Sequence, residues 1–175
     1  MKILTIVGSA NKNSHSLHLG QAITASLEKK EATVELIDLV EYQLPIFDRA
    51  RDLAKDYDEK TASFLQKTRE ADGFVWVTPV YHNSYSSTIK NALDWQHFSL
   101  DGKTVGMASN GGNRAPVAID PLMMVARSQH MIISSARVCT QESDYDESLN
   151  IASPEINKRI EQFADELILL TKKML

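Results

Sequence analysis

Residues 73–95 read GFVWVTPVYHNSYSSTIKNALDW and carry the strongest structural signal in the chain. The apolar run at 73–77 is typical of a short buried strand, which the following Thr-Pro pair ends. A loop of tyrosine, histidine, asparagine and serine comes next, and Ile89 and Leu93 then indicate a helix with one buried face. The stretch therefore predicts polar and aromatic groups at the carboxyl end of a strand, where open α/β sheets bind ligands.

The rest of the chain repeats this alternation of strand and helix. The expected strands cover residues 3–7, 33–37, 74–77, 104–108 and 131–138. The expected helices cover residues 14–30, 59–70, 86–95, 116–128 and 153–172. Five strands that alternate with five helices predict one α/β domain over residues 1–175, a doubly wound parallel sheet with helices on both faces. Two acidic connections, 38–58 and 141–153, are unusually long; solvated surface is the favoured interpretation and functional loops are the alternative.

Composition excludes several classes of protein. With 43% hydrophobic and 24% charged residues, the 175-residue chain is typical of a globular domain. The net charge of −4 and the lack of a basic cluster argue against nucleic acid as the main partner, although small anions stay possible. No stretch has the length of a membrane span or of a signal peptide. Cys139 is the single cysteine, so we expect no disulfide, no cysteine metal cluster, a structural thiol and a cytoplasmic location.

The loop between the first expected strand and helix, residues 8–16, reads GSANKNSHS and is rich in hydroxyl and amide groups. A phosphate at a helix N-terminus meets unpaired backbone N–H groups and the positive end of the helix dipole. The glycine spacing is neither that of a dinucleotide fingerprint nor that of a Walker A loop. The loop therefore suits one terminal phosphate, and a simple helix cap by Ser14 or Ser16 is the alternative.

The loop after the third expected strand can contact a planar ring. Backbone groups that follow Pro79 can reach a ring edge, and Tyr81 can stack on the ring or close the site. A flat apolar bed with donors and acceptors along one side suits the isoalloxazine of a flavin. His82 is the candidate proton donor of this loop, although a histidine in a loop is commonly a surface residue.

The loop after the fourth expected strand, residues 109–114, reads SNGGNR. Adjacent Gly111 and Gly112 permit positive φ and a close approach of the backbone, so that N–H groups can reach a ligand ring. A tight turn explains the two glycines equally well. However, the loops after strands one, three and four all belong to the carboxyl edge of the sheet, and this agreement favours a ligand site.

Together these residues resemble the NAD(P)H-dependent FMN reductase family of the flavodoxin-like superfamily, whose members include bacterial quinone, chromate and azo-dye reductases. The resemblance extends from the first strand to Arg114, and the last third of the chain adds a compatible pattern. The matching motifs are Gly8-Ser-x-x-x-x-Ser14, Pro79-x-Tyr81 with Ser84, KNALDW at 90–95, and Gly111-Gly112.

The resemblance implies a flavodoxin-like, five-stranded sheet in the order 2-1-3-4-5 that binds FMN without a covalent bond. The residues expected to hold the phosphate are Ser9, Asn11, Ser14, His15 and Ser16. Those expected along the flavin ring are Pro79, Val80, Tyr81, His82 and Asn83, with Ser109, Gly111 and Gly112 at its other edge. Relatives commonly form homodimers or homotetramers with the flavin near the interface, where Trp95, Gln96 and His97 would belong, and core packing is the alternative for Trp95.

Three positions depart from the family pattern. Many relatives carry arginine where Asn11 stands, so phosphate binding is expected either to be weaker or to depend more on Lys12. Many have an acid and an asparagine in place of Val80 and His82, and a Pro-Gly pair is common where this chain has serines at 86–87. These changes leave the cofactor as expected and the acceptor open.

The function expected from the resemblance is an enzyme that passes hydride from NADPH or NADH through FMN to a quinone, azo dye, flavin or similar small molecule, in ping-pong order. Backbone donors of residues 109–113 would stabilise the charge on the reduced ring, and His82 is the catalytic candidate. The alternative is a non-enzymatic flavodoxin-type electron carrier, although such carriers tend to be more acidic than −4. A third reading is a flavin-free module that binds a protein partner.

Overall fold

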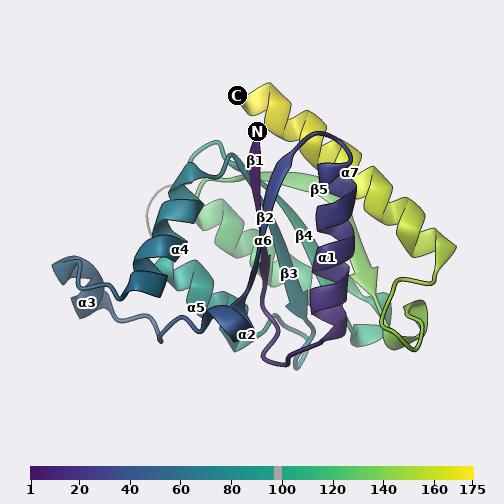
Figure 1. Ribbon diagram of the computed structural model, residues 1–175, viewed down its shortest axis with the longest axis horizontal. Coiled ribbons are helices and arrows are strands. Elements are labelled where there is room, and N and C mark those ends of the chain that lie inside the picture. Colours follow the sequence, from purple (N-terminus) through teal and green to yellow (C-terminus); the bar gives the residue numbers. More distant parts are fainter. Residues whose placement is uncertain (97–99) are drawn as a thin grey trace.

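The computed structural model describes residues 1–96 and 100–175 and shows a parallel sheet between two layers of helices (Figure 1). The strands are β1 (Lys2–Val7), β2 (Thr33–Asp38), β3 (Gly73–Pro79), β4 (Thr104–Asn110) and β5 (Ile132–Thr140). Their order is β2-β1-β3-β4-β5, which confirms the predicted flavodoxin-like arrangement. β1, β3 and β4 are therefore neighbours at the centre of the sheet.

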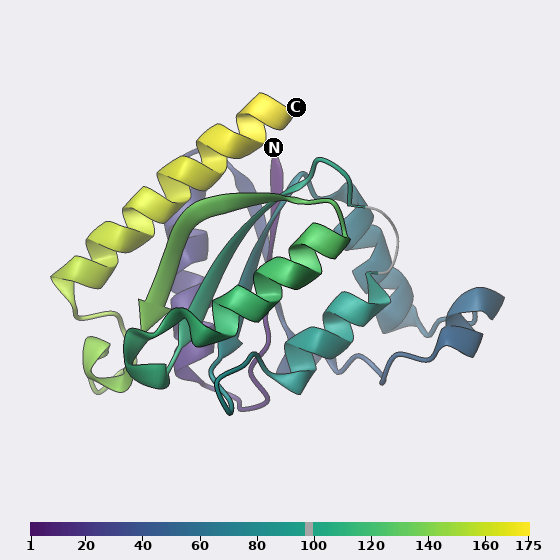
Figure 2. The same cartoon turned by 180° about the vertical axis from the view of Figure 1, so that it is seen from behind.

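The helices divide between the two faces of the sheet, as Figures 1 and 2 show from opposite sides. One face is covered by α1 (His15–Glu28) and α7 (Pro154–Met174). The other is covered by α4 (Glu59–Glu70), α5 (Ser87–Trp95) and α6 (Ile119–Ser128). Within the described ranges, the structure contains no helix whose length and apolar character would suit a membrane span.

β3 shows why the sheet needs both layers. Phe74 and Trp76 pack in the cluster under α4, α5 and α6, whereas Val75 and Val77 pack under α1 and α7. All four side chains are fully buried, as expected of a parallel strand that is covered on both faces. On neighbouring β4, a Cβ at Gly106 would lie 2.4 Å from the ring of Phe163, so glycine allows α7 to approach the sheet closely.

The structure shifts several predicted boundaries. The helix expected at 116–128 begins with a 3₁₀ turn at Pro116–Ala118, and α6 starts only at Ile119. The fifth strand extends to Thr140, so that buried Cys139 lies inside it. The long connection 38–58 also contains two short helices, α2 (Leu39–Tyr42) and α3 (Arg49–Ala54). Asp38 and Asp48 cap these helices, because each side chain accepts a backbone N–H at 3.2 and 2.8 Å, respectively.

The connection 38–58 is fastened to α5. Asn91 Nδ2 and Trp95 Nε1 both donate to the carbonyl of Pro45 at 2.9 Å. In return, the Phe47 N–H donates to Asn91 Oδ1 at 2.8 Å, and the Phe47 ring meets the Trp95 ring edge-on at 5.1 Å. Beyond this anchor, α3 projects from the body of the molecule (Figures 1 and 2), where Leu53 is exposed.

This anchor corrects one expectation from the resemblance. Trp95 is 1% exposed and Gln96 is fully buried within the single chain, so neither side chain faces a partner subunit. The physical reason is that the connection 38–58 folds over α5 and covers the Trp95 side chain, which would otherwise be exposed. His97, the third residue expected there, lies outside the described residues.

A bulge in β5 depends on one carboxylate of α7. The register between β4 and β5 shifts between Val105 and Met107, which leaves residues 134–136 outside the regular ladder. Glu166 Oε1 accepts from the backbone N–H groups of Ser135 and Ala136 at 2.6 and 2.9 Å. It also accepts from the hydroxyls of Ser134 and Ser135 at 2.7 and 2.9 Å. Burial acts to raise the pKa of Glu166, but these hydrogen bonds outweigh it and lower that pKa.

We expect Glu166→Gln to lower the free energy of unfolding by about 1–2 kcal/mol at pH 7, because the hydrogen bonds lose their charge. The folded-state pKa of Glu166 lies below its ordinary value of 4.5, so this stabilisation is complete above pH 4.5 and is lost as the pH falls through the lowered pKa. Urea unfolding at pH 7 and at pH 4 measures this difference. A gap between the two proteins that does not shrink in acid would contradict the assignment.

Candidate functional site

Three loops lie side by side at the carboxyl edge of the sheet, because β1, β3 and β4 are adjacent strands. The Gly8 N–H donates to the Val77 carbonyl at 2.8 Å, which joins the loop after β1 to the end of β3. The Val80 N–H donates to the Asn110 carbonyl at 2.9 Å, which joins the loops after β3 and β4. The structure thus brings together the three segments in which all the predicted site residues lie.

The first loop presents backbone donors at the start of α1. Ser9 is buried, and its Oγ accepts from the Asn11 N–H at 3.1 Å, which turns the loop back on itself. Ser14 is the N-cap of α1, with its Oγ accepting from the Leu17 N–H at 3.2 Å. None of the N–H groups of residues 12–16 has a hydrogen bond of normal geometry with another described group, although the turn at residues 12–13 brings the Ser14 N–H toward the Asn11 carbonyl. Such a cluster of free donors is the usual anion site of a helix N-terminus.

Lys12 is held by a residue that the sequence did not indicate. Its Nζ lies 2.7 Å from a carboxylate oxygen of Glu41 on α2. The hydrogen bond to Glu41 raises the pKa of Lys12. Lys12 was expected to compensate for the arginine that many relatives carry, yet its charge is shared with Glu41. The hydroxyls and backbone N–H groups are consequently the main donors of this loop.

The second loop folds into a two-residue turn. Tyr81 and Ser84 exchange both backbone hydrogen bonds at 2.9 Å, while His82 and Asn83 have φ of 49° and 60°. Two consecutive positive φ values define a type I′ turn. The side chains of His82 and Asn83 are exposed at its tip, and Tyr81 is 46% exposed beside them. This geometry presents an aromatic ring and a histidine to the open edge of the site.

Ser86 ties the second loop to the first. Its hydroxyl donates to the Gly8 carbonyl and accepts from the Ile89 N–H at 3.1 Å, so that it also caps α5. Its own N–H donates to Thr78 Oγ1 at 3.0 Å. Thr78 and Ser86 are both fully buried. A serine just before a helix is a common N-cap in sequence terms, but the added bond to Gly8 could not be found from the sequence because it spans 78 positions.

The third loop has an unusual backbone. Gly111, Gly112, Asn113 and Arg114 all have positive φ, at 112°, 60°, 53° and 61°. Glycine adopts such angles without a steric cost, and asparagine tolerates them better than most residues. The two glycines also pack on the second loop, since a Cβ at Gly111 would lie 3.4 Å from the Val80 Cβ.

Arg114 fastens this loop to a segment that follows β5. Its Nε donates to Asp144 Oδ2 at 2.9 Å, a second nitrogen contacts Asp144 Oδ1, and a third lies 3.2 Å from Glu155. Asp144 is fully buried, so the guanidinium is the charge that balances its carboxylate. Nothing in the local sequence identifies this pair, because its members are 30 positions apart.

The end of β4 offers unused polar groups to a ligand. Ser109 Oγ and Asn110 Nδ2 are buried, and neither has a hydrogen bond of normal geometry within the part of the chain that the structure describes. Beside them, an open hollow of about 480 Å³ is lined by Gly111, Gly112, Asn113, Gln141, Glu142 and Ser143. Buried polar atoms normally have partners, so a bound group with donors and acceptors along one edge fits this place.

Cys139 of β5 lies opposite Ser109 of β4. Burial raises the pKa of its thiol, and the neighbouring Ser109 hydroxyl opposes that rise only in part. A protonated, buried thiol is unreactive, which agrees with the structural role expected from the sequence. Across the described ranges, no three histidine, cysteine or acidic side chains are grouped so that they could hold a metal ion.

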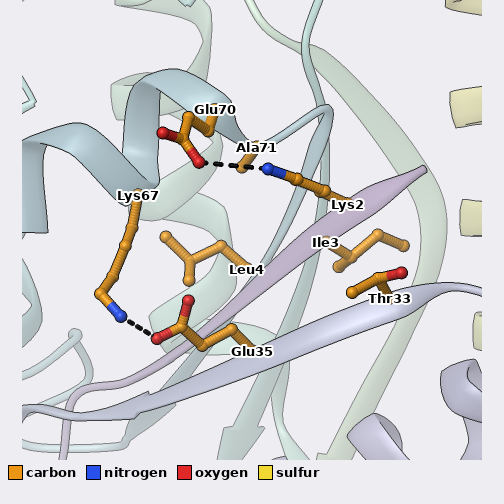
Figure 3. Close-up of a pocket in the computed structure, with 8 residues that line it drawn as sticks. All are labelled: Lys2, Ile3, Leu4, Thr33, Glu35, Lys67, Glu70 and Ala71. Carbon is orange, nitrogen blue, oxygen red and sulfur yellow. Dashed lines mark hydrogen bonds and ion pairs between the residues drawn. The ribbon is translucent and has the colours of Figure 1, made fainter.

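A second hollow lies at the opposite end of the sheet, where β1 and β2 begin (Figure 3). Lys2 is paired with Glu70 at 3.1 Å, and Lys67 is paired with Glu35. The volume is about 130 Å³, below the roughly 300–1,000 Å³ of ordinary ligand pockets. Its charged groups are paired with one another, so the carboxyl edge remains the candidate site.

Comparisons with known proteins identify the family of this chain. The sequence profile of NADPH-dependent FMN reductases matches residues 1–141. The chain is 34% identical to an FMN-dependent NADPH-azoreductase of Staphylococcus saprophyticus, over 98% of this chain and 96% of that protein. It is 31% identical to an FMN-dependent NADPH-azoreductase of Staphylococcus haemolyticus, over 96% of this chain and 94% of that protein.

Solved structures share the fold at lower identity. FerB, a flavoenzyme NAD(P)H:(acceptor) oxidoreductase from Paracoccus denitrificans, superposes with a TM-score of 0.81 at 21% identity, over 99% of this chain and 98% of that one. An oxidoreductase from Corynebacterium diphtheriae gives a TM-score of 0.80 at 21% identity, over 98% of this chain and 97% of that one. Sequence, profile and fold agree, and the chain therefore belongs to the NADPH-dependent FMN reductase family.

Proposed function

We propose that residues 1–175 form a single FMN-binding domain that passes hydride from NADPH or NADH, through FMN, to a small acceptor such as a quinone, an azo dye or a flavin. The observation that carries this proposal is the cluster of free backbone donors at the start of α1, beside two loops that present aromatic and backbone groups at the same edge. FMN supplies the redox chemistry when bound, since its ring can take up a hydride and return the electrons.

The first loop holds the phosphate in this proposal. The free N–H groups of residues 12–16 and the dipole of α1 favour a doubly charged anion, and short hydroxyls add neutral donors. No arginine is required, and Lys12 is already paired with Glu41. The assigned residues are Ser9, Asn11, Ser14, His15 and Ser16.

The second and third loops hold the ring. Their backbones approach closely, because Gly111 and Gly112 pack against Val80, and this brings amide groups to one edge of a flat ligand. The buried Asn110 amide nitrogen and Ser109 hydroxyl have no hydrogen bond of normal geometry among the described residues and would supply further polar contacts. Donors at this edge would stabilise negative charge on the reduced ring. The assigned residues are Pro79, Val80, Tyr81, His82, Asn83, Ser109, Gly111 and Gly112.

The names of similar proteins support the choice of electron donor and acceptor. The similar staphylococcal proteins are named FMN-dependent NADPH-azoreductases, which supports NADPH as the donor and azo dyes among the acceptors. Tyr81 is exposed at the open edge of the site. We propose ping-pong order, in which this one open face would receive donor and acceptor in turn. We further propose a cytoplasmic location and assembly into a homodimer or homotetramer. The exposed apolar side chains of Ile46, Leu53 and Met124 support the assembly. Light scattering of the purified protein measures the assembly.

The purified protein is expected to bind FMN and to oxidise NADPH or NADH when an azo dye, a quinone or free flavin is present. Absorbance at 340 nm follows the nicotinamide, and a flavin spectrum after gel filtration reports the cofactor. A colourless protein that takes up no added FMN would contradict the proposal. A yellow protein that oxidises neither nicotinamide would instead support a flavodoxin-type electron carrier.

The double change Ser14→Ala and Ser16→Ala is expected to weaken FMN binding by about tenfold to a hundredfold, because one cap and two hydroxyl donors are lost at the phosphate. Fluorescence titration of FMN into the apoprotein measures the dissociation constant. Asp58→Ala is the control, since it also removes a helix N-cap, that of α4, but belongs to none of the three loops. Equal FMN affinity in the double variant and the wild type would remove this loop from the phosphate site.

His82 is proposed as the proton donor to the acceptor. His82→Asn keeps the left-handed turn, because asparagine tolerates positive φ. The change removes the imidazole that is proposed to donate the proton. We expect kcat with a quinone to fall by about 100-fold while FMN affinity stays unchanged. Steady-state kinetics with NADPH and a quinone measure kcat. A kcat equal to that of the wild type would assign the proton to solvent instead.

A further inference from the structure

Tyr145 connects the first loop to the ends of β4 and β5. Its hydroxyl donates to the His15 carbonyl at 3.1 Å, across 130 positions of sequence. It also lies 2.8 Å from Thr140 Oγ1. A carbonyl can only accept, so the tyrosine proton is used on His15. The single proton of Thr140 then has two acceptors, the tyrosine oxygen at 2.8 Å and the Ser109 carbonyl at 3.4 Å, and the shorter contact favours the tyrosine. The Tyr145 ring also meets the His15 ring edge-on, with 4.5 Å between their centroids.

Asp144, the residue before Tyr145, binds the third loop. Asp144 binds the Arg114 guanidinium through both carboxylate oxygens and accepts from the Gln141 N–H at 2.9 Å. Asp144 is fully buried and Tyr145 is half-buried. Two consecutive residues therefore hold two different loops of the proposed site. Both lie beyond residue 141, where the match to the family profile ends.

The Tyr145 hydroxyl keeps its proton at any working pH. Burial raises its pKa to about 12, although the hydrogen bond from Thr140 and the neighbouring Asn110 amide oppose that rise. Asn110 Nδ2 itself does not reach hydrogen-bonding geometry with any described group. The hydroxyl is consequently a constant donor to His15, in a place that water reaches only in part.

We propose that Tyr145 is a positioning residue for the cofactor, and that it acts by fixing the first turn of α1 against the ends of β4 and β5. The proposal rests on the proposed function, because it assigns the phosphate to the N–H groups of that turn. A turn that is ordered before binding spares the cofactor the entropy of ordering it. Asp144 has the same role for the third loop, through Arg114.

Tyr145→Phe removes the hydroxyl and keeps the ring contact with His15. We expect its dissociation constant for FMN to rise by about tenfold, the effect of losing about 1.4 kcal/mol of binding free energy. Tyr57→Phe is the matched control, because it also loses a hydrogen-bonded hydroxyl, 2.7 Å from Asp52, in a residue that has no hydrogen bond to any of the three loops. Circular dichroism of both apoproteins establishes that each is folded at the titration temperature.

Titration with riboflavin, which lacks the phosphate, separates positioning from general loosening. Tyr145→Phe is expected to weaken FMN binding much more than riboflavin binding, whereas Asp144→Asn is expected to weaken both ligands because it acts on the ring loop. Equal FMN affinity in wild type, Tyr145→Phe and Tyr57→Phe would overturn the inference, as would equal losses for FMN and riboflavin in Tyr145→Phe. A wild type that binds no FMN would instead defeat the proposed function.

Discussion

The buried hydroxyl of Ser86 is the contact on which the candidate site depends. This hydroxyl donates to the Gly8 carbonyl and accepts from the Ile89 N–H, which caps α5. The backbone N–H of Ser86 donates to the Thr78 hydroxyl. The contact requires a glycine on the other side, because a Cβ at Gly8 would lie 2.4 Å from the Ile89 Cβ. Many relatives are expected to carry proline where Ser86 stands. Here a serine adds a direct bond between the first loop and the second loop.

The same helix explains the family signature at residues 90–95. Asn91 and Trp95 bind the Pro45 carbonyl and so hold the connection 38–58 against α5, while Lys90 pairs with Asp94 on the helix surface. The signature therefore stabilises architecture beside the site and supplies no group to the chemistry. The connection is also not plain loop, and one of its two helices carries Glu41, which neutralises Lys12 of the first loop. A segment expected to be solvated surface thus supplies a charged partner to the loop that is proposed to bind phosphate.

The part of the chain beyond β5 completes the site from the other side. Asp144 compensates Arg114, whose backbone has positive φ, and Tyr145 holds the start of α1. Positive φ at a non-glycine residue costs free energy, and the buried ion pair supplies a reason for the loop to keep that conformation. All three loops are thereby bound to a neighbour: the first through Ser86 and Tyr145, the second through Ser86, and the third through Asp144.

The sequence by itself determined the five strands, most of the helices and the three loops at one edge, because buried strands and amphipathic helices leave a regular apolar pattern along the chain. Resemblance to the family added the strand order, which the structure confirms. Only the tertiary structure decided that Trp95 is core, that Lys12 meets Glu41, and that Ser86, Asp144 and Tyr145 join the loops. These contacts link positions between 29 and 130 residues apart, and they depend on how the loops pack over the sheet edge, which leaves no periodic trace in the sequence.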